Sequence, residues 1–154
     1  MPELHHRPSQ ALEEIAATCD GVAAGDLTLV GSSLGGFYAT VMAERLGCRA
    51  ALINPAVHPQ RHFGKYLGPQ KNLYTGAEFV LTPEHVEDLR DADPPVLMRP
   101  ERYWLFVETG DEVLDYREAV ERYAGALQEV VRGGDHSMVS FPEYITEIVA
   151  WALT

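Results

Sequence analysis

The stretch Leu29-Val30-Gly31-Ser32-Ser33-Leu34-Gly35-Gly36 joins an apolar run over residues 27–30 to a helical pattern over residues 34–46. The apolar run is typical of a short buried strand, and the spacing after it is typical of a helix. A serine between two glycines at such a strand-to-helix turn has its hydroxyl lifted clear of the sheet, where it can act as a nucleophile. The Gly-x-Ser-x-Gly spacing alone also fits a flexible loop, but the patterned elements on both sides favour the nucleophile.

The geometry of this turn makes three demands on its residues. Ser33 must adopt a strained backbone with positive φ. We expect that a Cβ at Gly31 or Gly35 would clash as the helix folds back on the strand, so that both positions require glycine. The backbone N–H of Leu34, at the N-terminus of the helix, is expected to point toward an oxyanion that forms beside Ser33.

The bulk composition indicates one globular domain over residues 1–154 with one hydrophobic core. Its formal charge of −11 argues against nucleic acid or an anionic membrane as a partner, because both need basic patches. Cys19 and Cys48 lie in apolar surroundings and are interpreted as small core residues in a reducing compartment. The polar N-terminus is no signal peptide, and no apolar run is long enough to span a bilayer. We therefore expect a cytoplasmic protein.

Strand patterns alternate with helix patterns along the rest of the chain. Further strands are predicted over residues 49–53, 103–107 and 128–131, and helices are predicted to be capped by Ser9, Thr82, Asp115 and Ser140. The last two caps are followed three residues later by a glutamate, as in a capping box. This alternation implies an α/β fold with a mostly parallel sheet, whose active site lies at the carboxyl ends of the strands.

Residues 55–81 form a long segment without a regular pattern. Prolines and glycines break it repeatedly, while aromatic residues such as Tyr66 and Phe79 keep it partly apolar. A segment of this length inside a compact domain is usually functional. We predict that it covers the pocket beside Ser33.

Two further strand ends carry the partners that a nucleophilic serine needs. The third predicted strand is followed by Thr109-Gly110-Asp111, and the fourth by Gly133-Gly134-Asp135-His136. A serine hydroxyl needs an imidazole to take its proton, and the imidazole needs a carboxylate on its other nitrogen. The parallel sheet would bring Ser33, Asp111 and His136 to one edge, in the chain order Ser, Asp, His. The two glycines before His136 would allow the sharp turn that presents its ring.

Asp111 has four competitors for the role of the acid. Asp115 has a structural role as a helix cap, and Asp135 adjoins His136, so its side chain is poorly placed to reach that ring. Glu108 and Glu112 are weaker alternatives. The remaining histidines have no such context, and they do not form a metal-ligand pattern.

Six motifs extend the pattern through most of the chain: Val30-Gly-Ser-Ser-Leu-Gly-Gly-Phe-Tyr-Ala-Thr40, Ile53-Asn-Pro-Ala-Val57, Tyr66-Leu-Gly68, Asn72-Leu-Tyr-Thr-Gly76, Thr109-Gly-Asp-Glu-Val-Leu-Asp-Tyr-Arg117 and Gly133-Gly-Asp-His136. Together they resemble the small YqiA/YcfP-type esterases of the α/β-hydrolase superfamily. The resemblance implies a three-layer α/β-hydrolase fold, no cofactor and no metal. It also implies esterase or thioesterase activity on small-molecule acyl esters, with Ser33, Asp111 and His136 as nucleophile, acid and base.

The sequence departs from this family before the serine. The family's first strand and His-Gly-Phe-type loop, which supply the second oxyanion donor, have no counterpart before Ser33, so the chain resembles an N-terminally truncated relative. The strand over residues 27–30 would then be an exposed edge, open to pairing with another copy of the chain. With the Leu34 N–H as its single donor, we expect slow hydrolysis. The alternative is a non-catalytic α/β module that acts by protein association.

Overall fold

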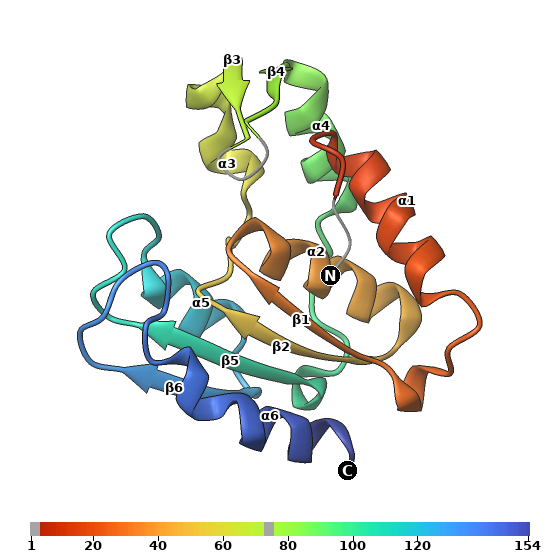
Figure 1. Ribbon diagram of the computed structural model, residues 1–154, viewed down its shortest axis with the longest axis vertical. Helices are drawn as coiled ribbons and strands as arrows, with labels where there is room; N and C mark the ends of the chain where they lie inside the picture. The colour runs from red at the N-terminus through yellow and green to blue at the C-terminus, as the bar shows by residue number, and fades with distance from the viewer. Residues whose placement is uncertain (1–3, 73–75) are drawn as a thin grey trace. The chain divides into compact units, whose positions relative to one another are not determined.

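The computed structural model describes residues 4–72 and 76–154. Its contacts divide the chain into two compact units (Figure 1). One contains the chain up to Asp20 together with His58–Asp93, and the other contains Gly21–Val57 and Pro94–Thr154. The second unit holds the central sheet and every residue that the sequence nominates for catalysis.

The central sheet is parallel throughout, where the sequence predicted a mostly parallel sheet. Its four strands lie in the order β1-β2-β5-β6. Their bounds are Thr28–Ser32 for β1, Arg49–Ile53 for β2, Tyr103–Glu108 for β5 and Leu127–Val131 for β6. Each lies within two residues of the strand expected from the apolar runs. The strand that leads into Ser33 forms one edge, and Val30 on it is 54% exposed.

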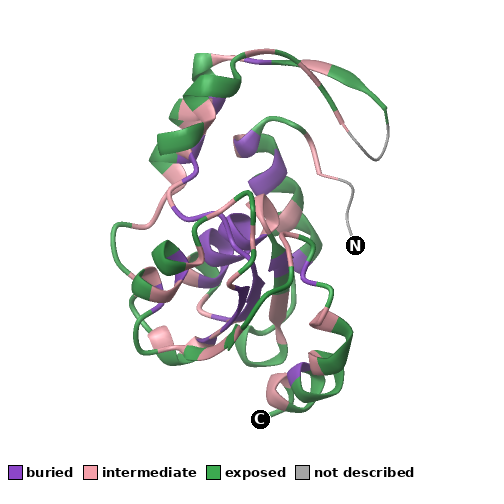
Figure 2. Cartoon of the chain, turned by 90° about the vertical axis from the view of Figure 1, so that its left-hand side faces the viewer, coloured by how far each residue is buried: buried purple, intermediate pink, exposed green. Residues whose placement is uncertain are grey.

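Side chains that alternate along β2 and β5 build a core on each face of the sheet. On one face, Leu52 and Leu105 pack with alanines of α2 (Leu34–Leu46) and of α5 (Tyr116–Arg122). On the other face, Ile53 and Phe106 pack against α6 (Ile145–Ala152) and the 3₁₀ turn η4 (Phe141–Tyr144) before it. The unit is therefore a three-layer α/β structure, and its buried residues gather on the central strands (Figure 2).

The first unit is helical with a small hairpin. Its helices are α1 (Pro8–Cys19), α3 (Gln60–Phe63) and α4 (Pro83–Ala92), with the 3₁₀ turn η2 (Gly64–Tyr66). Its hairpin pairs β3 (Gly68–Lys71) antiparallel to β4 (Glu78–Leu81). Short 3₁₀ turns η1 (Ala24–Asp26) and η3 (Pro100–Arg102) belong to the second unit.

Segment 55–81 thus contains regular structure that the sequence pattern did not reveal. Both strands have only four residues, which is too short for an alternating apolar pattern to stand out, and β3 reads Gly-Pro-Gln-Lys. Residues 73–75 of the Asn72–Gly76 motif lie outside the described residues. The expected role of the segment as a cover for the pocket stays a prediction.

Two of the four predicted caps are correct and two are wrong. Asp115 accepts from the Arg117 N–H at 3.0 Å, and Thr82 directly precedes α4 with Pro83 in its first turn. Ser9 lies inside α1, because Pro8 already occupies the first turn, and its hydroxyl donates to Asp88 at 2.7 Å. Ser140 makes no cap, because its hydroxyl donates instead to Glu108 at 2.5 Å.

None of the helices in the described part of the chain has the length and apolar character needed to cross a membrane.

Candidate active site

The turn between β1 and α2 has the strained backbone that its sequence predicts. Ser33 has φ of 54° and ψ of −124°, a backbone conformation that residues other than glycine rarely adopt. Backbone hydrogen bonds hold it there. The Ser33 N–H donates to the Ile53 carbonyl at 3.0 Å, and the Ser33 carbonyl accepts from the Ala56 N–H at 2.9 Å. The turn is thereby tied to the end of the neighbouring strand β2.

The glycines of the motif are not equivalent. A Cβ on Gly31 would lie 2.2 Å from the Gly35 carbonyl oxygen, which confirms the expected clash at the first glycine. A Cβ on Gly35 would meet nothing within 4 Å, so the expectation for the second glycine was wrong. The close approach falls one residue later, because a Cβ on Gly36 would lie 2.7 Å from the Cβ of Pro55.

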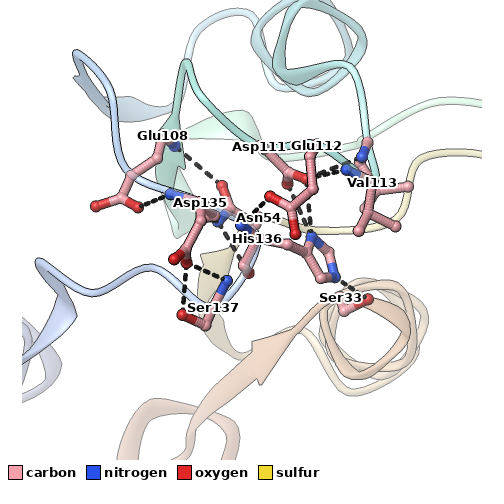
Figure 3. Close-up of polar contacts among 10 residues, drawn as sticks. Ser33, Asn54, Glu108, Asp111, Glu112, Val113, Asp135, His136 and Ser137 are labelled. Atoms are coloured by element: carbon pink, nitrogen blue, oxygen red, sulfur yellow. Dashed lines mark hydrogen bonds and ion pairs between the residues drawn. The ribbon is translucent and has the colours of Figure 1, made fainter.

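The three residues chosen from strand ends lie together at the carboxyl edge of the sheet (Figure 3). The His136 Nε2 lies 3.0 Å from the Ser33 hydroxyl oxygen. The His136 Nδ1 lies 3.0 and 2.9 Å from the two Asp111 carboxylate oxygens. The imidazole therefore connects the hydroxyl to the carboxylate, with one ring nitrogen for each.

The Asp111 carboxylate is fixed independently of His136. Its Oδ1 accepts from the backbone N–H groups of Val113 at 2.8 Å and Leu114 at 2.9 Å. The side chain is 2% exposed, against 22% for that of His136. A carboxylate held by backbone donors and shielded from water keeps its orientation toward the ring while the histidine side chain reaches the surface.

Each competitor of Asp111 has another partner. Asp115 caps α5, and Glu112 accepts from the His136 backbone N–H at 3.0 Å. Asp135 accepts from the backbone and the hydroxyl of Ser137, and these hydrogen bonds hold the pKa of its carboxyl below the usual value. Glu108 is 1% exposed and binds the loop around His136 rather than its ring.

Sequence reasoning missed one polar residue at this edge. Asn54 follows β2 with φ of 38°. Its amide donates to the carbonyls of Asp135 at 3.1 Å and His136 at 3.2 Å, and its carbonyl oxygen accepts from the Glu108 N–H at 3.0 Å. An asparagine directly after a buried strand, where a helix or loop begins, was the available signal.

The other five histidines lie in the first unit, His62 among them in α3. His5, His6 and His85 stack on one another, with ring centroids 4.1 Å apart for the first pair and 5.6 Å for His6 and His85. The His58 Nδ1 lies 2.5 Å from the Asp93 carboxylate. Within residues 4–72 and 76–154, no group of three or more His, Cys, Asp or Glu side chains is placed to hold a metal ion.

The sequence matches the uncharacterised protein family UPF0227 over residues 1–153. The chain belongs to this family. The match covers both units and all three residues of the hydrogen-bonded chain.

Solved structures show the same fold at low identity. The α/β-hydrolase domain-containing protein 10 of mouse is 16% identical with a TM-score of 0.69, over 96% of this chain and 70% of that one. The monoacylglycerol lipase of Paleococcus ferrophilus is 15% identical with a TM-score of 0.66, over 99% and 77%. An esterase domain from Rhodothermus marinus is 20% identical with a TM-score of 0.61, over 94% and 66%. The chain therefore has an α/β-hydrolase fold.

The unequal glycines lead to opposite predictions for the same substitution. Gly31→Ala forces the backbone apart and should lower the free energy of unfolding by roughly 3 kcal/mol. Gly35→Ala enters open space in a helix and should leave it unchanged or raise it by up to about 1 kcal/mol. Urea denaturation of both variants measures the difference. Equal midpoints would contradict the steric account of the turn.

Proposed function

We propose that the protein is a serine hydrolase that cleaves carboxylic esters or thioesters through an acyl-enzyme intermediate. The observation that supports this most is the hydrogen-bonded chain from the Ser33 hydroxyl through both nitrogens of His136 to Asp111. These residues follow β1, β6 and β5 at one edge of the sheet, where parallel α/β sheets carry their active sites.

In the first half of the reaction, the Ser33 oxygen attacks the ester carbonyl carbon while its proton passes to the His136 Nε2. Asp111 accepts the hydrogen bond from Nδ1, which fixes the tautomer and stabilises the imidazolium. Negative charge develops on the carbonyl oxygen. The Leu34 N–H, in the first turn of α2, has no acceptor within the helix and is the donor that we assign to this oxygen.

The tetrahedral intermediate then collapses, and the carbon–oxygen or carbon–sulfur bond to the leaving group breaks. The leaving alcohol or thiol takes the proton from the His136 Nε2. In the second half, water attacks the acyl-enzyme and its proton passes to the same nitrogen. The bond from the acyl carbon to the Ser33 oxygen then breaks, Ser33 regains a proton from the imidazolium, and the carboxylic acid leaves. One imidazole serves as base and acid in both halves.

Exposed apolar side chains on the loops that carry Asp111 and His136 favour an acyl substrate. Val113 is 59% exposed on the loop that holds Asp111, and Val139 is 66% exposed on the loop that follows His136. Exposed apolar side chains next to reactive groups suit the hydrocarbon part of a substrate. Two of the similar structures are described as a lipase and an esterase, which agrees with this substrate class.

The proposal predicts covalent labelling at one residue. A fluorophosphonate probe should label the parent protein and fail to label Ser33→Ala, because the activated serine oxygen bonds to phosphorus and displaces fluoride. Hydrolysis of short nitrophenyl esters should fall to background in the same variant. Ser137→Ala is the matched control, because its hydroxyl donates to Asp135 instead. Equal hydrolysis by the parent and Ser33→Ala would favour the non-catalytic module.

The assignment of the acid is tested by one chemical change at two positions. Asp111→Asn should lower kcat by up to roughly 10⁴-fold, because an amide holds the imidazole in the wrong tautomer. Asp115→Asn should leave kcat unchanged, because asparagine also caps a helix well. Ester hydrolysis of both variants gives the comparison. A similar loss in both would refute Asp111 as the acid.

The predicted cover formed by residues 55–81 is tested at Tyr66, which is 51% exposed and packs edge-on against Phe63. Tyr66→Ala should change the ratio of kcat/KM between short and long acyl esters while the melting temperature stays near that of the parent. A series of nitrophenyl esters of increasing acyl length measures the ratio. An unchanged ratio across the series would remove the segment from the substrate site.

A further inference from the structure

Glu108 is a carboxylate buried at the carboxyl end of β5, beside the hydrogen-bonded chain but outside it. It is 1% exposed, and its carboxylate makes no contact with a positively charged side chain in any ion pair found among the described residues. A buried carboxylate is costly unless hydrogen-bond donors surround it. The groups that donate hydrogen bonds to Glu108 therefore indicate which part of the structure this side chain stabilises.

The donors all come from the loop that carries His136. The Asp135 N–H donates to Oε2 at 2.8 Å. The Ser140 hydroxyl donates to Oε1 at 2.5 Å, and the Ser140 N–H donates to the same oxygen at 3.3 Å. The two oxygens thus bind the residue just before His136 and a residue four positions after it. Between these attachments, Met138 has φ of 54°, so the loop is held in a conformation that it would not adopt freely.

Asn54 attaches the same loop from the neighbouring strand. Its amide donates to the carbonyls of Asp135 and His136, while its side-chain oxygen accepts from the Glu108 N–H. The ends of β2 and β5 therefore hold the loop through both its donors and its acceptors. Gly134 completes the packing, because a Cβ there would lie 1.9 Å from the Glu108 Oε2.

We propose that Glu108, with Asn54, is a positioning residue that sets the place of the His136 ring between Ser33 and Asp111. Glu108 binds the backbone beside His136 and acts on the reaction only through that histidine, so the effect on hydrolysis rests on the proposed function. Misplacement of a catalytic group by about 1 Å can cost roughly 10²-fold in rate. Loss of the hydrogen bonds from Asp135 and Ser140 to Glu108 is therefore expected to lower kcat while KM changes little.

The test compares three substitutions. Glu108→Leu removes every acceptor for the loop and should lower kcat by roughly 10²-fold. Glu108→Gln should keep much more of kcat than Glu108→Leu. Its oxygen still accepts from the Asp135 N–H and its amide donates to the Ser140 hydroxyl oxygen, so only the long hydrogen bond from the Ser140 N–H is lost. Tyr103→Phe is the matched control, because it removes a partly buried hydrogen bond to Glu44 at the opposite end of the same strand. It should lower the melting temperature without lowering kcat.

A second readout does not depend on hydrolysis. In ¹⁵N-histidine NMR spectra, the Nδ1 proton of His136, assigned from its absence in His136→Gln, reports the hydrogen bond to Asp111. This resonance should persist in Glu108→Gln and Tyr103→Phe and shift or vanish in Glu108→Leu. If the parent hydrolyses no ester while this pattern holds, the positioning role stands and the proposed function fails.

Two results would overturn the positioning role. One is a folded Glu108→Leu variant whose kcat and Nδ1 resonance match those of the parent. The other is a Tyr103→Phe variant that loses as much kcat as Glu108→Leu, which would make the effect one of general stability. If Glu108→Leu does not fold, Ser140→Ala decides in its place. That variant should lower kcat several-fold relative to Tyr103→Phe and shift the resonance, and no change in either would reject the proposal.

Discussion

The arrangement of the site depends on one steric constraint, the close approach of Gly31 to the carbonyl oxygen of Gly35. Where a Cβ would lie 2.2 Å from that oxygen, only glycine allows the helix to fold back directly on the strand. The fold-back forces the positive φ of Ser33 and places its hydroxyl at the start of α2. Strain of this kind costs on the order of 1–3 kcal/mol and persists only where neighbouring structure holds it.

Neighbouring structure holds this turn from one side. The hydrogen bonds of Ser33 to the Ile53 carbonyl and from the Ala56 N–H both lead to the end of β2 and the residues after it. Asn54 lies between Ile53 and Ala56, and its side-chain amide binds the loop of His136. Ser33 and the loop of His136 are thus both held by hydrogen bonds to the same short stretch, residues 53–56. The Ser33 hydroxyl oxygen and the His136 Nε2, which lie 3.0 Å apart, thus belong to two segments that both bind the end of β2.

The parts of the structure that follow from local chemistry were predictable from the sequence. Apolar runs predicted the four parallel strands. The two glycines before His136 indicated a turn, and Gly133 and Gly134 both have positive φ. Asp111 was preferred over its competitors because it follows a strand end, and its carboxylate lies 2.9 Å from the His136 Nδ1. The tasks of Ser9 and Ser140 were not predictable, because each hydroxyl has a partner more than thirty positions away, at Asp88 and Glu108. Local pattern carries no information about such pairs.

The strained turn follows β1, the outermost strand on one side of the sheet, whereas the rest of the site follows β2, β5 and β6. Among the described residues, no strand pairs with the outer side of β1, and edges of this kind invite pairing with other chains. Yet the hydrogen bonds that hold Ser33 run to the β2 side, and Asp111 and His136 follow strands still farther from that edge. The hydrogen-bonded chain is therefore complete without a partner at the edge. A partner strand at this edge would pair with β1 and lie near Ser33. It would not contact the Asp111–His136 pair.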